Sequence, residues 1–381
     1  MMQKKRNGPL VVFVALVIVA MGVSLAVWMI GKMPTRSEVP HLYTRPAMNT
    51  EGELRVLVYH DMEGLSGQDD WRTFDFSYPE FYQKGQELLV NDVNAVIDGL
   101  FAGGATEVHV VDAHGSGNPR PDILSEKLDP RARQVFRDQP FRQYVDLTEP
   151  NVYDAVAVVG MHAKTGSKGF ASHTFTLGTE IIINGRSITE TELIAYSWGR
   201  VDVPVVFASG DDRLLDDLKD MNWLEYVVVK EATSASTVNL RPVDEVHAEM
   251  REKARRALEN LSRSKVMKIV EPVEAALRVV PPADLSVLRD VPGVNYSDNR
   301  IDFTAKNFQE AYDGVIGTIR VATRAYPQIL REVVSEQPNG EQLLLQYNER
   351  LYDRWLDYES GRWQPEQQSS PSTPRKYFGA R

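Results

Sequence analysis

The sequence predicts an α/β fold in which helices cover both faces of a mostly parallel sheet. An N-terminal transmembrane helix is expected before this domain, and a smaller C-terminal α+β lobe is expected after it. Near-continuously apolar strands alternate with helical stretches, which is typical of a parallel sheet buried on both faces. After about Leu240 this pattern changes to charged helices and a proline-punctuated strand region. A long uncharged run near the N-terminus predicts the membrane-spanning helix.

Composition narrows the class of protein. The chain has 381 residues, of which 43% are apolar and 25% are charged, and this is the composition of a globular protein. A net charge of -10 without a basic stripe argues against a nucleic-acid partner. The absence of cysteine excludes disulfides, thiolate zinc sites and cysteine nucleophiles. Any bound metal must therefore be held by His, Asp and Glu.

Residues 1–31 are predicted to form a cytoplasmic basic segment and a membrane anchor. Lys4, Lys5 and Arg6 precede residues 10–30, which carry no charge. About 20 apolar residues suffice to cross a bilayer. The alternative is a cleaved signal peptide, although this apolar run is longer than such peptides use. The prediction is a single-pass protein of the cell membrane whose catalytic domain is extracytoplasmic, with residues 32–53 as a spacer.

Residues 54–240 are predicted to form a metal-binding α/β catalytic domain. A strand over 54–60, a helix over 80–101 and a strand from 106 to 112 make a βαβ unit, which imposes parallel pairing. Further apolar strands are expected at 155–160, 180–183, 203–208 and 226–230, with helices at 190–196 and 211–221 between them.

The remaining sequence predicts two further segments. Residues 241–326 form a smaller second lobe with a strand region near 279–291 and a helix around 308–326. Residues 327–381 form a charged helical extension that ends in a polar, disordered tail.

Acids and imidazoles follow the ends of several predicted strands. Asp61 and Glu63 close the first strand on one face of it, where they repel unless a positive group lies between them. His114 and His162 follow two other strands, and His173 lies in an adjoining loop. Ligands of doubly wound sheets bind beyond the carboxyl ends of the strands, so these side chains should converge. Together they suit a divalent metal such as zinc.

The other histidines are interpreted as structural. His60 points away from the two acids, His41 lies in the spacer, His109 is mid-strand and His247 is on a charged helix.

Six ordered blocks of sequence resemble the M55 family of D-aminopeptidases, zinc peptidases that act on peptides with D-amino acids. The resemblance covers residues 54–326. The blocks are HDMEG at 60–64, VDAHG at 111–115, GMHA at 160–163, SHT at 172–174, INGRSITETELIAY at 183–196 and VPVVFASGDD at 203–212.

The resemblance implies a pair of zinc ions, with Asp61 as the bridge between them, and a catalytic histidine, His173. The implied metal ligands are Asp61, Glu63, His114, His162 and Glu190. Mn²⁺ and Co²⁺ are also compatible with such ligands. Such a pair of cations would offset the carboxylate repulsion at the end of the first strand.

The chain departs from the family pattern around the implied Glu ligand. Thr189 replaces a glycine before it, Ile194 replaces an asparagine in the following helix, and Glu192 is a second acid that competes with Glu190 for the ligand role. Ala113 replaces a hydroxyl residue beside His114. These differences affect the expected substrate pocket more than the expected metal set.

The leading hypothesis is a membrane-anchored zinc aminopeptidase that removes N-terminal residues, D-residues included, from short peptides. A metal-activated water attacks the peptide, and His173 assists by moving a proton or stabilising the oxyanion. Two alternatives stay open: a metal-dependent amidase of different specificity, and a catalytically silent binding module of the cell envelope. The resemblance also implies a homo-oligomer.

Overall fold

A computed structural model describes residues 41–44, 52–116, 118, 120–136 and 142–359. Its main layer is a seven-stranded sheet in the order β10-β9-β8-β5-β2-β3-β4. Neighbouring strands are parallel except for the hairpin of β9 and β10. The strands are β2 (Arg55–His60), β3 (Glu107–Asp112), β4 (Arg133–Gln134), β5 (Ala155–Val159), β8 (Val205–Asp211), β9 (Glu225–Ser234) and β10 (Thr237–Leu240).

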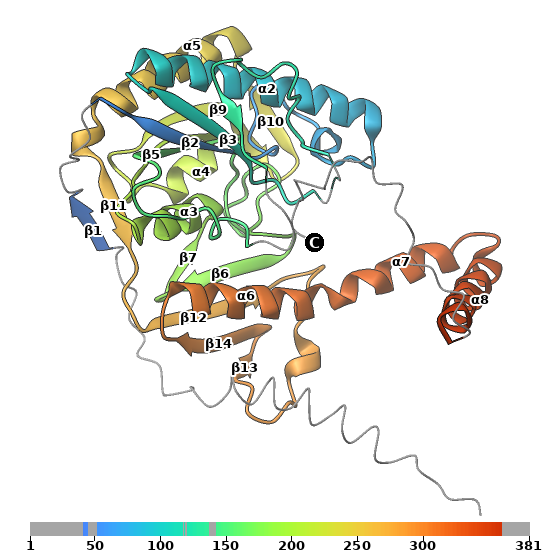
Figure 1. Ribbon diagram of the computed structural model, residues 1–381. Coiled ribbons are helices and arrows are strands. Elements are labelled where there is room, and N and C mark those ends of the chain that lie inside the picture. The colour runs from blue at the N-terminus through green and yellow to red at the C-terminus, as the bar shows by residue number, and fades with distance from the viewer. Residues whose placement is uncertain (1–40, 45–51, 117, 119, 137–141, 360–381) are drawn as a thin grey trace, which may run out of the picture.

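The sheet is buried on both faces, as its apolar strands predict. On β2, Val56 and Val58 belong to one core, while Leu57 and Tyr59 belong to the other. Helices α2 (Pro79–Ala102) and α5 (Val243–Glu259) cover the first face, and α3 (Glu190–Gly199) lies on the opposite side (Figure 1). The mixed α/β class with a mostly parallel sheet is therefore confirmed.

A second, five-stranded antiparallel sheet lies beyond α3, in the order β13-β14-β12-β6-β7. Its strands are β6 (Thr179–Ile183), β7 (Arg186–Ile188), β12 (Val273–Val279), β13 (Tyr296–Ser297) and β14 (Arg300–Ala305). The apolar run over 180–183 was expected among the strands of the parallel sheet, and here that expectation is wrong. This run pairs instead with β12 in antiparallel register, so the second sheet combines strands from both sides of residue 240.

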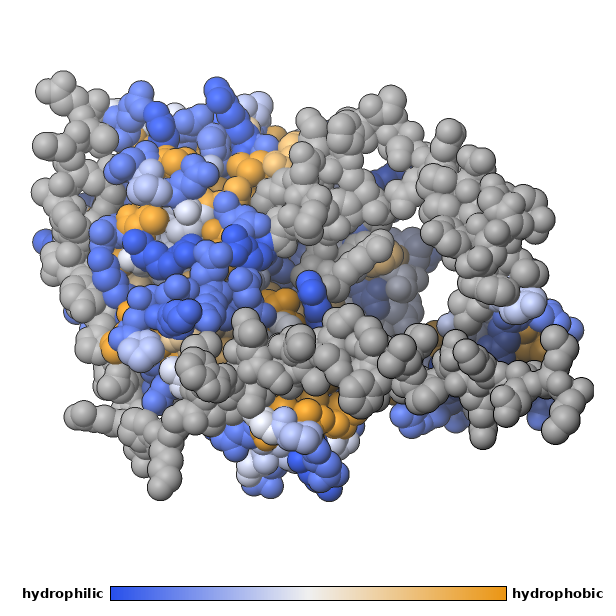
Figure 2. All heavy atoms as spheres, turned by 60° about the horizontal axis from the view of Figure 1, so that its bottom comes forward, coloured by the Kyte–Doolittle hydropathy of each residue, from blue (hydrophilic) through white to orange (hydrophobic). Residues whose placement is uncertain are grey.

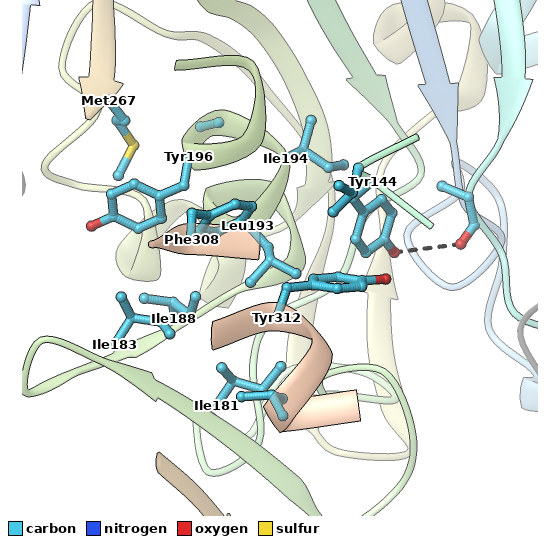
Figure 3. Packing of buried hydrophobic residues seen from close by; sticks show 14 of the residues in the cluster. Tyr144, Ile181, Ile183, Ile188, Leu193, Ile194, Tyr196, Met267, Phe308 and Tyr312 are labelled. Carbon is cyan, nitrogen blue, oxygen red and sulfur yellow. Dashed lines mark hydrogen bonds between the residues drawn. The ribbon is translucent and has the colours of Figure 1, made fainter. Parts of the chain in front are cut away.

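Helix α6 (Phe308–Ala322) packs against β12 and β14 and joins the core beneath the parallel sheet. Figure 3 shows Phe308 and Tyr312 of this helix beside Leu193 of α3 and near the isoleucines of β6. Residues before and after 240 thus share one core, and α5 also packs on α2. The boundary at residue 240 stays a prediction.

The other elements are peripheral. They are β1 (His41–Thr44) paired with β11 (Lys265–Lys268), the short helix α4 (Asp212–Asp217), α7 (Tyr326–Ser335) and α8 (Gly340–Glu359). Helices α7 and α8 extend to one side of the two sheets (Figure 1). Among the coloured residues of the face turned forward in Figure 2, hydrophilic residues predominate and apolar residues form small groups between them.

The predicted membrane location is wrong. Within the described residues, no helix combines the length and the apolar character that a bilayer crossing requires. The structure therefore gives no support for a single-pass cell-membrane protein with an extracytoplasmic catalytic domain. The apolar run over residues 10–30, on which that expectation rested, lies outside the described residues, as do most of the predicted spacer and the tail.

Close packing of α2 on α5 depends on Gly99. A Cβ atom at this position would lie 2.3 Å from the Arg251 carbonyl oxygen. We expect Gly99→Ala to lower the free energy of unfolding by about 1–3 kcal/mol, because the helices must separate. Gly317→Ala on α6 is the matched control: nothing lies within 4 Å of its added methyl, and it should be neutral or stabilise by up to about 1 kcal/mol. Equal denaturation midpoints for the two variants would contradict this account.

Candidate metal centre

The site forms where the carboxyl ends of β2, β3 and β5 meet. The chain runs outward from β2 to β3 and β4 on one side and to β5, β8 and β9 on the other, so the site lies at the switch point of the sheet. The loops after β2 and β5 touch: the amide of Asp61 donates to the carbonyl of Val159 at 2.8 Å, and that of Gly64 donates to Gly160 at 2.8 Å. A Cβ at Gly64 would lie 1.9 Å from the Met161 carbonyl oxygen, so only glycine allows this approach.

All six site residues proposed from the sequence lie together in this place. Ligand atoms within 4.8 Å of one another form three groups. These are Asp61, Glu63 and His114; Asp61, His162 and Glu190; and Glu63, His162 and His173. The groups overlap, and Asp61 belongs to both of the groups that contain two carboxylates.

Each of the three imidazoles directs Nε2 into the cluster. His114 Nε2 is 3.4 Å from a Glu63 oxygen, and His173 Nε2 is 4.0 Å from the same oxygen. His162 Nε2 is 3.5 Å from both an Asp61 oxygen and a Glu190 oxygen. The rings of His162 and His173 are stacked with centroids 3.9 Å apart.

The Nδ1 atoms are held from outside the cluster. They lie 2.9 Å from Asp122 for His114, 3.0 Å from the Ala163 carbonyl for His162 and 2.7 Å from the Ala171 carbonyl for His173. Metal-binding histidines are oriented in this way, with one nitrogen anchored and the other left for the ion. Nε2 of His162 is buried and has no hydrogen-bond partner among the described residues. The donor set therefore fits a divalent cation.

Electrostatics at the site favour positive charge. Burial raises the pKa of Asp61 well above its usual range, and the adjacent charge of Glu63 raises it further. Burial would lower the pKa of His162, but the neighbouring charges of Glu190 and Asp61 outweigh this effect and raise it to about 10. Burial would raise the pKa of Glu190, but the positive charge of His162 lowers it to about 2. The carboxylates thus draw a cation, or failing that a proton, into the cluster.

Glu190, and not Glu192, faces the cluster. Thr189 caps α3: its hydroxyl accepts from the Glu192 amide at 3.0 Å, and its own amide donates to the Glu192 carboxylate at 2.8 Å. Arg186 pairs with the same carboxylate. Glu190 instead accepts from the Phe175 amide at 2.7 Å. The replacement of glycine by Thr189 therefore creates a capping box that occupies the competing acid.

Sequence reasoning missed the residues that support the cluster. The Tyr144 hydroxyl donates to Glu190, and Asp122 anchors His114. Both lie in irregular loops, where no periodicity points to them. Lys230 has a readable signal, because it is a charged residue inside the otherwise apolar strand YVVVK. The histidines interpreted as structural lie outside the metal-ligand groups: His109 contacts Tyr153, and His247 contacts Asp92.

Lys230 is fully buried against the loop that carries Asp61 and Glu63. Its ammonium donates to the Glu63 carbonyl at 2.8 Å and to the Gln68 side chain at 2.7 Å, and it lies 4.1 Å from the centre of the Phe170 ring. Burial lowers its pKa to about 7. The lysine thus holds the backbone of the loop that carries two of the proposed ligands.

A pocket of about 320 Å³ opens in front of the cluster. Its lining includes Asp61, Glu63, His114, His173 and Glu190. Aromatic and aliphatic side chains form much of the remaining wall. These are Trp71, Phe74, Phe76, Ala113, Phe175 and Leu177. A small molecule that enters this pocket therefore meets carboxylates and imidazoles at its base and apolar groups around it.

An α/β fold with a buried carboxylate–imidazole cluster at a strand-end pocket is the architecture of a metallohydrolase. The sequence profile of the D-aminopeptidase family matches residues 54–316. The chain belongs to this family, peptidase family M55, and the predictions of that family and of a metallopeptidase are confirmed.

A curated relative and a solved structure agree with this assignment. The D-aminopeptidase of Bacillus subtilis (strain 168) is 29% identical over 278 residues, which cover 71% of this chain and 98% of the relative. The solved structure is the Zn-dependent D-aminopeptidase DppA from Bacillus subtilis, described as a self-compartmentalizing protease. It matches with a TM-score of 0.64 at 26% identity and covers 71% of this chain and 98% of its own. Both the relative's zinc dependence and the clusters above support the expected zinc cofactor.

Lys230→Met should weaken zinc binding, because the Glu63 carbonyl and the Gln68 side chain lose their buried donor and the ligand loop loosens. Changes in such supporting contacts cost about 10–100-fold in metal affinity. The matched control is Lys253→Met, since Lys253 also donates to a carbonyl, that of Tyr226 at 2.6 Å, but lies on α5 away from the ligand loop. Competition with a fluorescent zinc chelator measures both constants. An unchanged zinc affinity in folded Lys230→Met would contradict the assignment.

Proposed function

We propose that this chain is a zinc-dependent aminopeptidase that removes N-terminal residues, D-residues included, from short peptides. The observation that carries the proposal is that Asp61 belongs to two candidate metal-binding groups, each with two carboxylates and one imidazole. Asp61 also lines a pocket of about 320 Å³, which has room for the N-terminal residue of a short peptide. The family's activity and the similarity to a Zn-dependent D-aminopeptidase of known structure support the same function.

We further propose a pair of zinc ions. Asp61, His162 and Glu190 would hold one ion, and Asp61, Glu63 and His114 would hold the other, with Asp61 shared. Bound zinc acts as a Lewis acid and lowers the pKa of a coordinated water. Tyr144 and the Phe175 amide fix the orientation of Glu190, and Asp122 fixes that of His114.

His173 is proposed as the group that moves a proton during hydrolysis. It lines the pocket, whereas His162 does not. Burial lowers the pKa of His173, and the charge of His162 lowers it further, so its imidazole is neutral near pH 7. A neutral imidazole can accept a proton from the attacking water and pass it to the leaving amine. The carbonyl of Ala171 holds Nδ1, which leaves Nε2 for this exchange.

We propose that residues 54–326 form the peptidase unit, with 54–240 as the metal-binding domain, 241–326 as a second lobe and 327–381 as an extension. The family match, which ends at residue 316, supports the position of the extension. We also propose a homo-oligomer, because the relative is described as self-compartmentalizing.

His114→Ala should lose zinc and hydrolysis of D-alanyl peptides together. His114 belongs to only one ligand group, so zinc content measured by elemental analysis should fall by about half or more. His109→Ala is the control, because His109 sits on the preceding strand and bonds to Tyr153 at 2.7 Å outside the cluster. The proposal fails if the His114 variant keeps both its full zinc content and its activity.

His173→Ala separates catalysis from metal binding. We expect this variant to keep its zinc while kcat falls by about 100-fold or more, the usual contribution of a positioned acid or base. His173 also belongs to the group with Glu63 and His162. Loss of zinc together with activity would make His173 a ligand and overturn the proposed role.

A further inference from the structure

A single short segment supplies four of the residues that line the pocket in front of the cluster. They are Trp71, Phe74, Asp75 and Phe76. The segment over residues 71–76 contains the 3₁₀ helix η1 (Trp71–Phe74) and follows the loop that carries Asp61 and Glu63. Its side chains therefore stand where a substrate would enter, next to the proposed metal ligands.

This segment is held in place by buried contacts. The Gln68 amide donates to the Thr73 hydroxyl at 2.9 Å, and that hydroxyl donates to the Asp70 carbonyl at 2.6 Å. The Thr73 carbonyl rests on α2 at Gly85, where a Cβ would lie only 1.9 Å away. Contacts within the protein thus hold this wall of the pocket, and small-molecule sites are usually largely pre-formed in this way.

The charge of the segment is negative on its pocket side. Arg72, its only cation, pairs with Asp70 at 2.5 Å and stacks 3.7 Å from the centre of the Phe81 ring, and neither Arg72 nor Asp70 lines the pocket. Asp75 does line it, and it is the one lining acid outside the proposed metal cluster. Its carboxylate accepts from the Ser77 amide at 2.9 Å, which fixes its orientation.

None of the described residues that line the pocket is Lys or Arg, so no ammonium or guanidinium group of the lining competes for Asp75. Apolar side chains line the same pocket as Asp75. Trp71 is 46% exposed, Phe76 is 40% exposed and Leu177 is 57% exposed, so the mouth keeps apolar surface in contact with water. Burying such surface against an apolar side chain is favourable.

We infer that residues 71–76 select the N-terminal residue of the substrate: Asp75 binds its α-ammonium group, and Trp71 and Phe76 receive an apolar side chain. The inference rests on the proposed aminopeptidase function and adds to it the group that binds the free amine and a preference for a large apolar N-terminal residue. A peptide with a blocked amine or a small polar first residue loses one of the two contacts.

The test uses the zinc-loaded full chain and the substrate D-leucyl-glycine amide. Asp75→Asn keeps the acceptor for the Ser77 amide but removes the charge, and KM should rise about tenfold or more with kcat nearly unchanged. Asp69→Asn is the control, because Asp69 is an exposed acid close by that does not line the pocket. An unchanged KM for Asp75→Asn in an active enzyme overturns the inference.

A double variant tests the apolar part. Trp71→Ala with Phe76→Ala should reduce the preference for D-leucyl over D-seryl peptides by about fivefold or more, while hydrolysis of the D-seryl peptide changes little. An unaltered preference in this variant contradicts the assignment of the two rings.

Binding of D-leucinol, an uncleavable amino alcohol, distinguishes the two levels of the proposal. Calorimetry should show binding to the wild type that weakens about tenfold or more in Asp75→Asn, and weaker binding of N-acetyl-D-leucinol to the wild type. If this pattern holds but no peptide is hydrolysed, the proposed function fails and the subsite stands. If peptides are hydrolysed but D-leucinol binds equally well to the wild type and to Asp75→Asn, the proposed subsite is wrong and the proposed function stands.

Discussion

Three carboxylates buried in one place are the constraint on which the structure depends. Asp61, Glu63 and Glu190 are each at least 95% buried, and their oxygens lie within reach of the same imidazoles. Removing an ionised carboxylate from water costs several kcal/mol even after relaxation, so such a group survives only if positive charge compensates it. Against the opposing effect of burial, the neighbouring carboxylates also raise the pKa values of His114 and His162, which favours the positively charged form of both imidazoles. The proposed pair of zinc ions would supply that positive charge.

Several features of the fold bring these carboxylates and imidazoles together and hold them in place. The parallel sheet brings three strand ends to one edge, and Gly64 allows the loops after β2 and β5 to touch. Acceptors outside the cluster hold Nδ1 of His114, His162 and His173, and Lys230 donates to the backbone of the loop that carries Glu63. The same loop continues into the aromatic segment over residues 71–76. One stretch of chain therefore positions Asp61 and Glu63 and also forms part of the pocket wall. Gln68 contacts both Lys230 and Thr73, so it connects the loop of the proposed metal ligands with the proposed substrate-binding segment.

Much of the scaffold was predictable, because buried parallel strands carry their own signature and their ends mark a site. The convergence of Asp61, His114 and His162 follows from that rule alone. Glu190 came only from family resemblance, and its competition with Glu192 could be resolved only by the capping box. The sequence could not predict which sheet β6 joins. Its partner β12 lies about ninety residues away in the chain, and an apolar run carries no information about the strand with which it pairs. The membrane location was wrong: no helix in the described part of the chain is long and apolar enough to cross a bilayer. The apolar run that suggested it, residues 10–30, lies outside that part.

Anomalous diffraction from crystals of the zinc-loaded protein, recorded on both sides of the zinc absorption edge, tests the central claim most directly. The account predicts two zinc peaks, both about 2.0–2.2 Å from carboxylate oxygens of Asp61, one also bound by His162 and Glu190 and the other by Glu63 and His114. A map with no zinc peak among these side chains, or with zinc bound elsewhere on the chain, would contradict it.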